Sequence, residues 1–262
     1  MDIANLFRIQ KEFMIKGIRR DIVFKMTFIT NILTDFVFNY LKIVFLEVLY
    51  LYGKVEIAGF TLDEMKFLFG CSFIIISLYM LFVFFGHIYL PNKIQNRTLD
   101  YVLLKPMPII LNISFNRFNI AGIGSTLYGL YLIINSVGKI NITFDALNIA
   151  VFLLNIVIGF IIYSSLSLIL YTISFWSLKA DGIIGIIAVM GDFTKYPHKI
   201  YPIGIQFFLS FVFPVLFACT YPVENQLLNL NIYYLILNLL VMVIILCISN
   251  LFLKRGLLKY NN

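Results

Sequence analysis

The sequence predicts an all-α integral membrane protein with six transmembrane helices and with its N- and C-termini in the cytoplasm. Hydrophobic residues make up 61% of the 262 positions and charged residues only 13%. The mean hydropathy is +0.95, which is far outside the range of soluble domains. Six apolar runs are each near or above the roughly 20 residues that a helix needs to cross about 30 Å of hydrocarbon. Lysine and arginine gather in alternate connections, which marks the cytoplasmic side.

The chain is expected to form a single transmembrane domain over residues 1–262. The six predicted spans cover residues 26–51, 66–90, 109–136, 147–176, 200–221 and 232–253, so the spans pair within 26–90, 109–176 and 200–253. Between and around them we expect an interfacial helix at 1–25, a cytoplasmic amphipathic helix at 91–108, an interfacial segment at 177–199 and a cytoplasmic tail at 254–262. In this arrangement fifteen Lys and Arg residues are cytoplasmic and three are not.

Three segments of this plan rest on local patterns. In residues 1–25 apolar side chains share one helical face and basic ones the other, as in a helix on an anionic leaflet, and an ordinary juxtamembrane anchor is the alternative. For 177–199 the alternative is a re-entrant segment shielded by protein. Pro214 and Pro222 predict a broken or kinked outer end of the fifth span.

Several function classes are excluded. The pairs Gly53-Lys54 and Gly138-Lys139 are not followed by Ser or Thr, so the chain has no phosphate-binding loop. Its three cysteines lie in apolar runs without metal-ligand spacing, and its two histidines stand alone in the sequence. No basic cluster adjoins a soluble fold that could bind nucleic acid. We therefore expect no catalytic residues, no metal site and no cofactor bound by this chain.

The first span carries an unusual polar stripe. Asn31, Asp35, Asn39 and Lys42 follow one another at +4, +4 and +3 and so share one helical face. Charges at that depth cost on the order of a few kcal/mol unless they are paired or hydrated. The stripe is expected either to line a solute path or to hold helices together, with Asp35 paired to Lys42 or to Arg117 of the third span. Glycines of the third span at 122, 124 and 129 predict close helix contact.

The amphipathic stretch 91–108 predicts a short helix that needs a binding partner. Leu99, Val102, Leu103 and Pro106 fall at i, i+3, i+4 and i+7, while Arg97, Asp100, Tyr101 and Lys105 point elsewhere. Thr98 is a candidate N-cap, and Pro106 ends the helix. A helix this short is marginal alone in water. We expect the leucine stripe to pack back on the protein and the polar face to meet the partner.

These features resemble the permease subunits of ABC-2 type (type V) exporters. The closer resemblance is to uncharacterised ABC-2 permeases whose second-loop motif runs Gly-x-Leu-Asp-x-x-Leu-x-Lys/Arg-Pro, read here at positions 97–106 with Arg97 in place of Gly. A later pattern of that family, an aromatic-x-x-Tyr-Pro, a proline in the next span and a second Tyr-Pro, is similar to Phe193–Pro197, Pro214 and Tyr221-Pro222.

The resemblance implies a function and partners. It implies a coupling helix that binds a cytoplasmic ABC ATPase dimer, which would hold ATP and Mg, through Arg97, Leu99, Asp100, Tyr101, Leu103, Lys105 and Pro106. It also implies a second permease subunit, identical or different, and a place in the inner (plasma) membrane among lipid. The residues expected to line the path or a subunit interface are Asn31, Asp35, Asn39, Lys42, Arg117 and Pro214. The expected solute is hydrophobic or amphipathic, such as a drug, peptide or lipid.

Two alternatives from other classes stay open. An ion-coupled secondary transporter would use Asp35 and Lys42 as its coupled pair, although six spans without a visible inverted repeat fit that plan poorly. A membrane scaffold that transports nothing requires no path at all.

Overall fold

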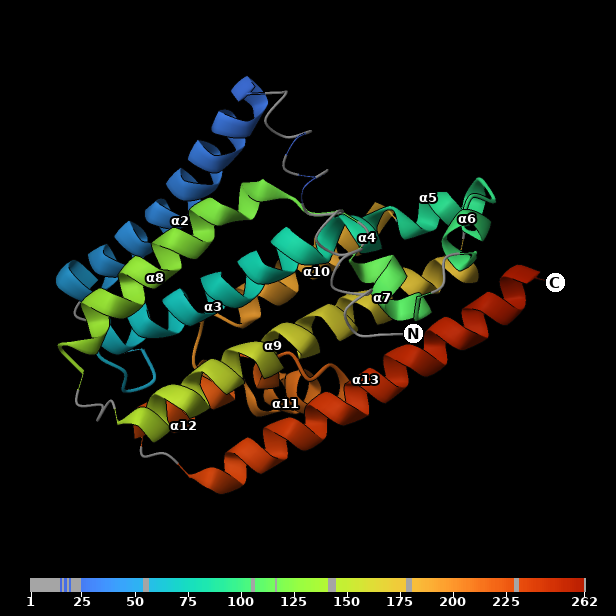
Figure 1. Ribbon diagram of the computed structural model, residues 1–262. Coiled ribbons are helices and arrows are strands. Elements are labelled where there is room, and N and C mark those ends of the chain that lie inside the picture. Colours follow the sequence, from blue (N-terminus) through green and yellow to red (C-terminus); the bar gives the residue numbers. More distant parts are fainter. Residues whose placement is uncertain are drawn as a thin grey trace.

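The fold is helical throughout its regular part (Figure 1). A computed structural model describes residues 15, 17, 19, 25–53, 57–104, 107–115, 117–140, 145–177, 181–228 and 231–261. The predicted interfacial helix at 1–25 therefore lies almost wholly outside the described residues. Five long helices make the frame, namely α2 (Lys25–Gly53), α3 (Leu62–Phe82), α8 (Ile123–Val137), α9 (Ala146–Thr172) and α13 (Ile232–Asn261).

Three helical stretches among the described residues are long and apolar enough to cross a membrane: Leu62–Phe82, Ala146–Phe175 and Ile232–Tyr260. The helix α2 has 29 residues, which is about 44 Å at 1.5 Å per residue, but it carries Asp35, Lys42 and Glu47. The shorter apolar helices are Ile123–Val137, Gly182–Phe193 and Ile203–Val212. The chain is thus a multi-pass membrane protein whose helices differ in length more than the sequence predicts.

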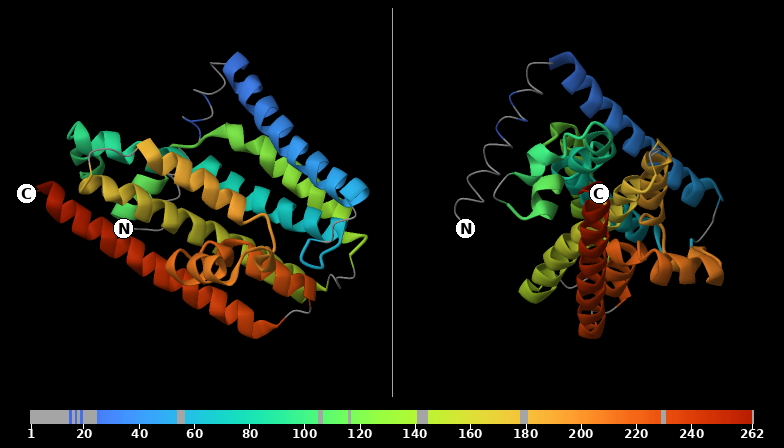
Figure 2. Two further views of the ribbon diagram at one scale, coloured as in Figure 1. Left: turned by 180° about the vertical axis from the view of Figure 1, so that it is seen from behind. Right: turned by 90° about the vertical axis from the view of Figure 1, so that its right-hand side faces the viewer.

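The helix α3 is the centre of the bundle, with α8 and α9 packed on it, α2 against α8 and α13 along α9 (Figure 1). The helices α2 and α13 lie on opposite sides of the bundle (Figure 2). A capping box at Thr61 and Glu64 starts α3. Gly70 of α3 and Gly129 of α8 face each other so closely that a Cβ on either would lie within 2.9 Å of the other's carbonyl oxygen. The predicted glycine contact of this region is therefore present.

Between α3 and α8 the chain forms short helices instead of one amphipathic helix. They are α4 (Phe84–Ile88), α5 (Leu90–Gln95), α6 (Asp100–Leu103), α7 (Ile109–Ser114) and the 3-10 turn η1 (Ile120–Gly122). Arg97, with φ of 52°, interrupts the helical path, and Leu99 occupies the N-cap of α6 without a side-chain cap. The predicted cap at Thr98 is wrong, span two ends at Phe82, and the long helix of span three begins only at Ile123.

The fifth predicted span, 200–221, is not one helix. The chain runs through α10 (Asp181–Phe193), η3 (His198–Ile200), α11 (Ile203–Phe207), a π-helical turn η4 (Phe208–Val212), η5 (Leu216–Ala218) and α12 (Thr220–Leu228). The helix breaks at Pro214, as predicted, because proline lacks the N–H that would continue it. Pro222 instead lies in the first turn of α12, where a missing N–H costs nothing.

The helix α10 packs against α9, and the residues that follow it reach α3. The Tyr163 hydroxyl of α9 donates a 2.8 Å hydrogen bond to the Ile187 carbonyl. Ser72 Oγ, in the middle of α3, donates to the Thr194 carbonyl at 2.5 Å. In the predicted tail 254–262, α13 continues to Asn261, and Gly256 packs directly on the Phe175 ring.

Candidate translocation site and coupling segment

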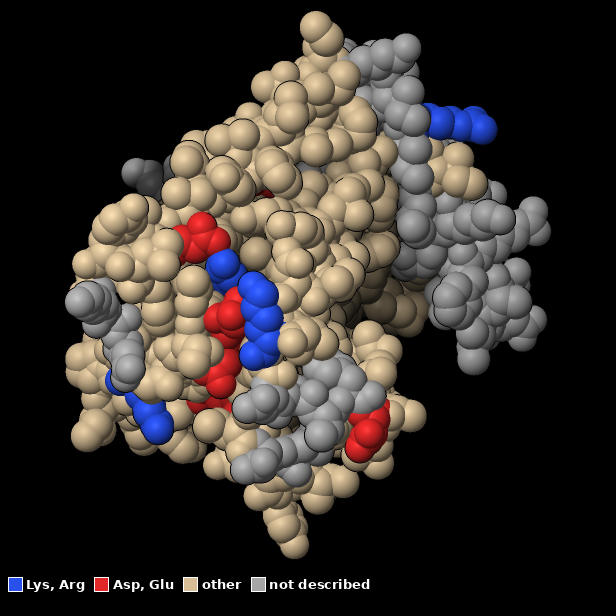
Figure 3. Space-filling model, turned by 90° about the vertical axis from the view of Figure 1, so that its left-hand side faces the viewer, with Lys and Arg blue, Asp and Glu red and all other residues tan. Residues whose placement is uncertain are grey.

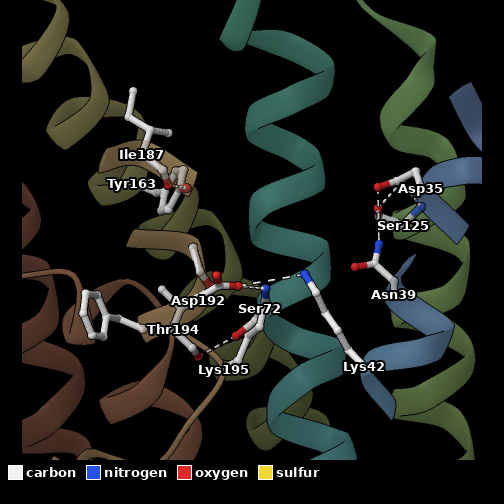
Figure 4. A network of polar contacts seen from close by, with 12 residues as sticks. Asp35, Asn39, Lys42, Ser72, Ser125, Tyr163, Ile187, Asp192, Thr194 and Lys195 are labelled. Carbon is white, nitrogen blue, oxygen red and sulfur yellow. Dashed lines mark hydrogen bonds and ion pairs between the residues drawn. The ribbon is translucent and has the colours of Figure 1, made fainter. Parts of the chain in front are cut away.

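The polar stripe of α2 is divided between two neighbouring helices (Figure 4). Asp35 and Asn39 turn to α8, where the backbone N–H and the hydroxyl of Ser125 both donate to Asp35 Oδ2, the first over 3.1 Å. Asn39 Nδ2 donates to Ser125 Oγ at 2.8 Å. The approach is close because Gly124 lacks a side chain: a Cβ there would lie 3.2 Å from the Ile32 carbonyl oxygen of α2. This half of the stripe holds two helices together.

Two of the predicted stripe partners lie elsewhere. Asn31 is exposed. Arg117 stacks over the Phe85 ring, 4.3 Å from its centroid, and donates to the Tyr89 hydroxyl at 3.1 Å. The prediction that Asp35 pairs with Arg117 or Lys42 is therefore wrong, since Asp35 bonds to Ser125 and Asn39 instead.

Lys42 points the other way, toward the end of α10 (Figure 4). Its ammonium lies 3.9 Å from Asp192 Oδ1, and Lys195 Nζ lies 2.5 Å from the same oxygen. Lys195 is only 5% exposed, and its ammonium lies 5.9 Å from the centroid of the Phe73 ring. Lys195, which the sequence places in a cytoplasmic connection, thus lies against the middle of α3.

A cavity of about 390 Å³ is lined by residues of both halves of the stripe. It is bounded by α2, α3, α10 and the start of α8. Its polar lining includes Asp35, Lys42, Asp192 and Lys195, and the face of α3 that it exposes runs from Phe73 to Met80 and on to Phe84. The volume lies in the range of small-molecule sites.

The coupling segment, which we define as Leu90–Leu104, presents two faces. Leu99 and Val102 are buried and Leu103 is half-buried, whereas Tyr101 is 72% and Leu104 80% exposed. Arg97 and Asp100 are also exposed, so the predicted division into an inner leucine face and an outer polar face holds for these residues. Lys105 and Pro106 lie outside the described residues.

A profile of the ABC-2 family transporter proteins matches residues 36–262, most of the chain. The chain belongs to this family. Searches of curated proteins and of solved structures gave no match. The chain is therefore an ABC-2 membrane permease, which has no ATPase site, and such permeases generally work with ABC ATPases.

A buried histidine of α4, just before the coupling segment of the permease, joins α7 to α9. His87 Nε2 lies 2.9 Å from Ser114 Oγ of α7, and Nδ1 lies 3.1 Å from Ser167 Oγ of α9. Ser167 also meets the Tyr79 hydroxyl of α3 at 2.5 Å. Complete burial lowers the pKa of His87 to about 3, so the ring is neutral. The sequence predicted a lone histidine at a membrane edge, and its serine partners are too distant in sequence to signal this role.

A second histidine of the permease is also paired. The His198 backbone N–H donates to Glu224 Oε1 at 2.8 Å, and its ring meets Glu224 Oε2. Glu224 belongs to α12 and is buried.

At the end of the molecule where α3 begins, Glu47 pairs with Lys66 at 2.6 Å, and Figure 3 shows acidic and basic side chains side by side there. Among the described residues no three His, Cys, Asp or Glu side chains gather as a metal site requires.

Sequence reasoning missed three residues of these sites. Asp192 and Lys195 come just after the short apolar run 182–190 and are three residues apart. Oppositely charged side chains at this spacing can pair across a helical turn. Leu104 is not among the predicted coupling residues, because it lies outside the apolar stripe of Leu99, Val102, Leu103 and Pro106. Its exposure is nonetheless the highest of the three leucines in this segment.

Proposed function

We propose that this permease is one half of an ATP-driven exporter. A second permease half and two cytoplasmic ABC ATPase subunits complete the transporter in the inner (plasma) membrane, and the solute is hydrophobic or amphipathic. The observation that carries the proposal is the outward face of the coupling segment, where Tyr101 and Leu104 are exposed on a short helix that cannot be stable alone. An apolar pair of this kind on a cytoplasmic segment fits the groove of a partner protein.

The support behind this face makes it suited to transmit force. Asn112 Nδ2 of α7 donates to the Val102 carbonyl at 2.5 Å. Gly86 of α4 packs so tightly on α7 that a Cβ there would overlap the Ile113 carbonyl. Through His87 and its serine partners α7 is in turn bonded to α9. A push on α6 therefore reaches the long helices through packed contacts that have little freedom to yield.

The path is assigned to the surface between α2 and α10. These two helices approach each other at the ion pair of Lys42 and Asp192, 3.9 Å apart, and both residues line the cavity. Much of the remaining surface of α2 is apolar and exposed, including Leu33, Val37 and Phe45, which supports a second permease half there. The bonds of Asp35 to Ser125 and Asn39 count against the ion-coupled alternative, because they occupy the carboxylate that it requires.

The test is binding of the host cell's ABC ATPase to the purified permease. Replacing Tyr101 and Leu104 together by Ala is expected to lower ATPase recovery at least ten-fold and to remove stimulation of ATP hydrolysis by the permease. Tyr52→Ala is the matched control, since Tyr52 is 83% exposed but lies at the far end of α2. Absence of any ATPase association with the wild-type permease, or association that survives the double substitution, would contradict the proposal.

A further inference from the structure

The charges around Asp192 do not balance. Two lysines, Lys42 and Lys195, approach one oxygen of one carboxylate, so this cluster carries an excess of one positive charge. Lys195 occupies the nearer position, and the Lys42 side chain stays 43% exposed at a distance of 3.9 Å. An ammonium has three donors. The contact at 3.9 Å is longer than a hydrogen bond, so Lys42 keeps donor capacity directed at the cavity.

Excess charge at this depth is costly in a membrane protein. The cluster lies level with Ser72, in the middle of α3, where a charge without a counter-ion costs on the order of a few kcal/mol. The other carboxylate on the cavity wall does not supply that counter-ion. Asp35 lies seven residues, or about 10 Å, from Lys42 along α2, and its oxygens accept bonds from Ser125 and Asn39.

Most of the remaining cavity wall is apolar, although Ser77, Asn119 and Tyr163 also line it. From the cluster it follows one face of α3 from Phe73 to Met80, a length of about 10 Å at 1.5 Å per residue, and reaches Phe84 of α4. Ile184 and Ile187 of α10 form the facing wall. The cavity wall carries two lysines and two aspartates, but Asp35 lies about 10 Å from Lys42, so the positive charge is in excess at the Lys42 and Lys195 end. Local positive charge beside an elongated apolar wall matches a molecule with one anionic group and an attached hydrocarbon chain.

We propose that this cavity binds an amphiphile with a single anionic headgroup. The headgroup lies at Lys42 and Lys195, and the apolar part lies along α3 toward the coupling segment. The inference rests on the proposed function, because it gives the chemical class of the transported solute. Its test uses the permease alone, so that failure to find an ATPase and failure to bind an anion are separate results.

The probe is 11-(dansylamino)undecanoate, compared with its primary amide, which has the same chain and fluorophore but no charge. The permease is reconstituted into phosphatidylcholine nanodiscs, and the signal of empty discs is subtracted. Wild type is expected to bind the carboxylate at least ten-fold more tightly than the amide. Equal affinities would overturn the proposal.

Substitutions locate the anion. Lys42→Gln is expected to remove the preference for the carboxylate while leaving amide binding unchanged. Asp192→Asn is expected to strengthen carboxylate binding, because the probe would replace the lost counter-ion, and structural damage does not produce a gain of this kind. Lys139→Gln is the matched control, since Lys139 pairs with Asp63 at 3.5 Å outside this cavity. A preference that survives Lys42→Gln in a protein with wild-type melting would overturn the proposal.

A final comparison distinguishes a membrane lipid from a free solute, which share this chemistry. Discs that contain phosphatidylglycerol supply an anionic lipid at high local concentration. Displacement of the probe in these discs supports the proposal with a bilayer lipid as ligand. Undiminished probe binding supports it with a free single-chain amphiphile as ligand.

Discussion

At the scale of single residues, the polar side chains of the α2 stripe differ in their surroundings. Asp35 and Asn39 are fully engaged by Ser125 across a helix contact, whereas Lys42 keeps an exposed ammonium at the cavity. One part of the stripe therefore holds two helices together, and we propose that the other part lines the solute path. Lys42 shares the helical face of Asp35 but lies seven residues, or about 10 Å, further along α2, and from there its long side chain reaches Asp192 of α10.

Removing the Ser125 hydroxyl should weaken the contact between α2 and α8. Ser125→Ala leaves Asn39 and Asp35 each short of a partner, and we expect a loss of about 1–3 kcal/mol of unfolding free energy. Ser136→Ala is the control, because Ser136 is a buried serine of the same helix whose hydroxyl finds no partner among the described residues. Unfolding in detergent with increasing dodecyl sulfate measures both. Equal losses for the two variants would contradict the assignment.

The neutral state of His87 should make stability depend on pH. Its pKa falls from 6.5 to about 3 because burial disfavours the charged ring, and among the described residues it contacts the hydroxyls of Ser114 and Ser167 and lies beside the rings of Tyr79 and Tyr171. Below pH 6.5 His87 binds a proton in the unfolded chain but not in the folded chain. The free energy of unfolding therefore falls by up to about 1.4 kcal/mol per pH unit. Melting temperatures between pH 7.5 and 4.5 should fall more for wild type than for His87→Gln. Parallel curves would contradict this.

At the scale of elements, the segment from α10 to α12 shows how a helical span is replaced by shorter pieces. Its parts are placed by contacts with α3 and α9, above all where η5 meets Gly159 of α9. The apolar composition of 200–221 is that of a membrane helix, and only Pro214 signals the break. Sequence reasoning therefore found the position of the break but not the path of the chain on either side of it.

Gly159 should be intolerant of a side chain. A Cβ at this position would overlap the Ala218 carbonyl, so Gly159→Ala is expected to cost about 2 kcal/mol or more through overpacking. The control is Gly185→Ala in α10, where a Cβ meets nothing within 4 Å and where alanine favours the helix by up to about 1 kcal/mol. Thermal unfolding should move in opposite directions for the two variants. A Gly159→Ala protein as stable as wild type would show that η5 lies elsewhere.

At the scale of the whole molecule, composition and charge were enough to predict a helical multi-pass membrane protein, and the resemblance to ABC-2 permeases was enough to indicate its family. Helix ends were predicted less well, because Arg97 adopts a positive φ that its residue type does not announce. The site was predicted in part. The spacing of Asp35 and Lys42 is local information, but their partners Ser125 and Asp192 lie 90 and 150 positions away, and only packing brings them together.

The meeting of Thr220 with the carbonyls of Thr194 and Tyr196 joins the two ends of a long excursion of the chain. The segment 197–219 therefore begins and ends at the same place, where the His198 backbone N–H also donates to Glu224. The return of this segment is part of the core, because Leu216, Ala218 and Cys219 are fully buried. A change of length or composition that leaves the neighbouring helices in place is therefore expected only in the largely exposed stretch 203–208.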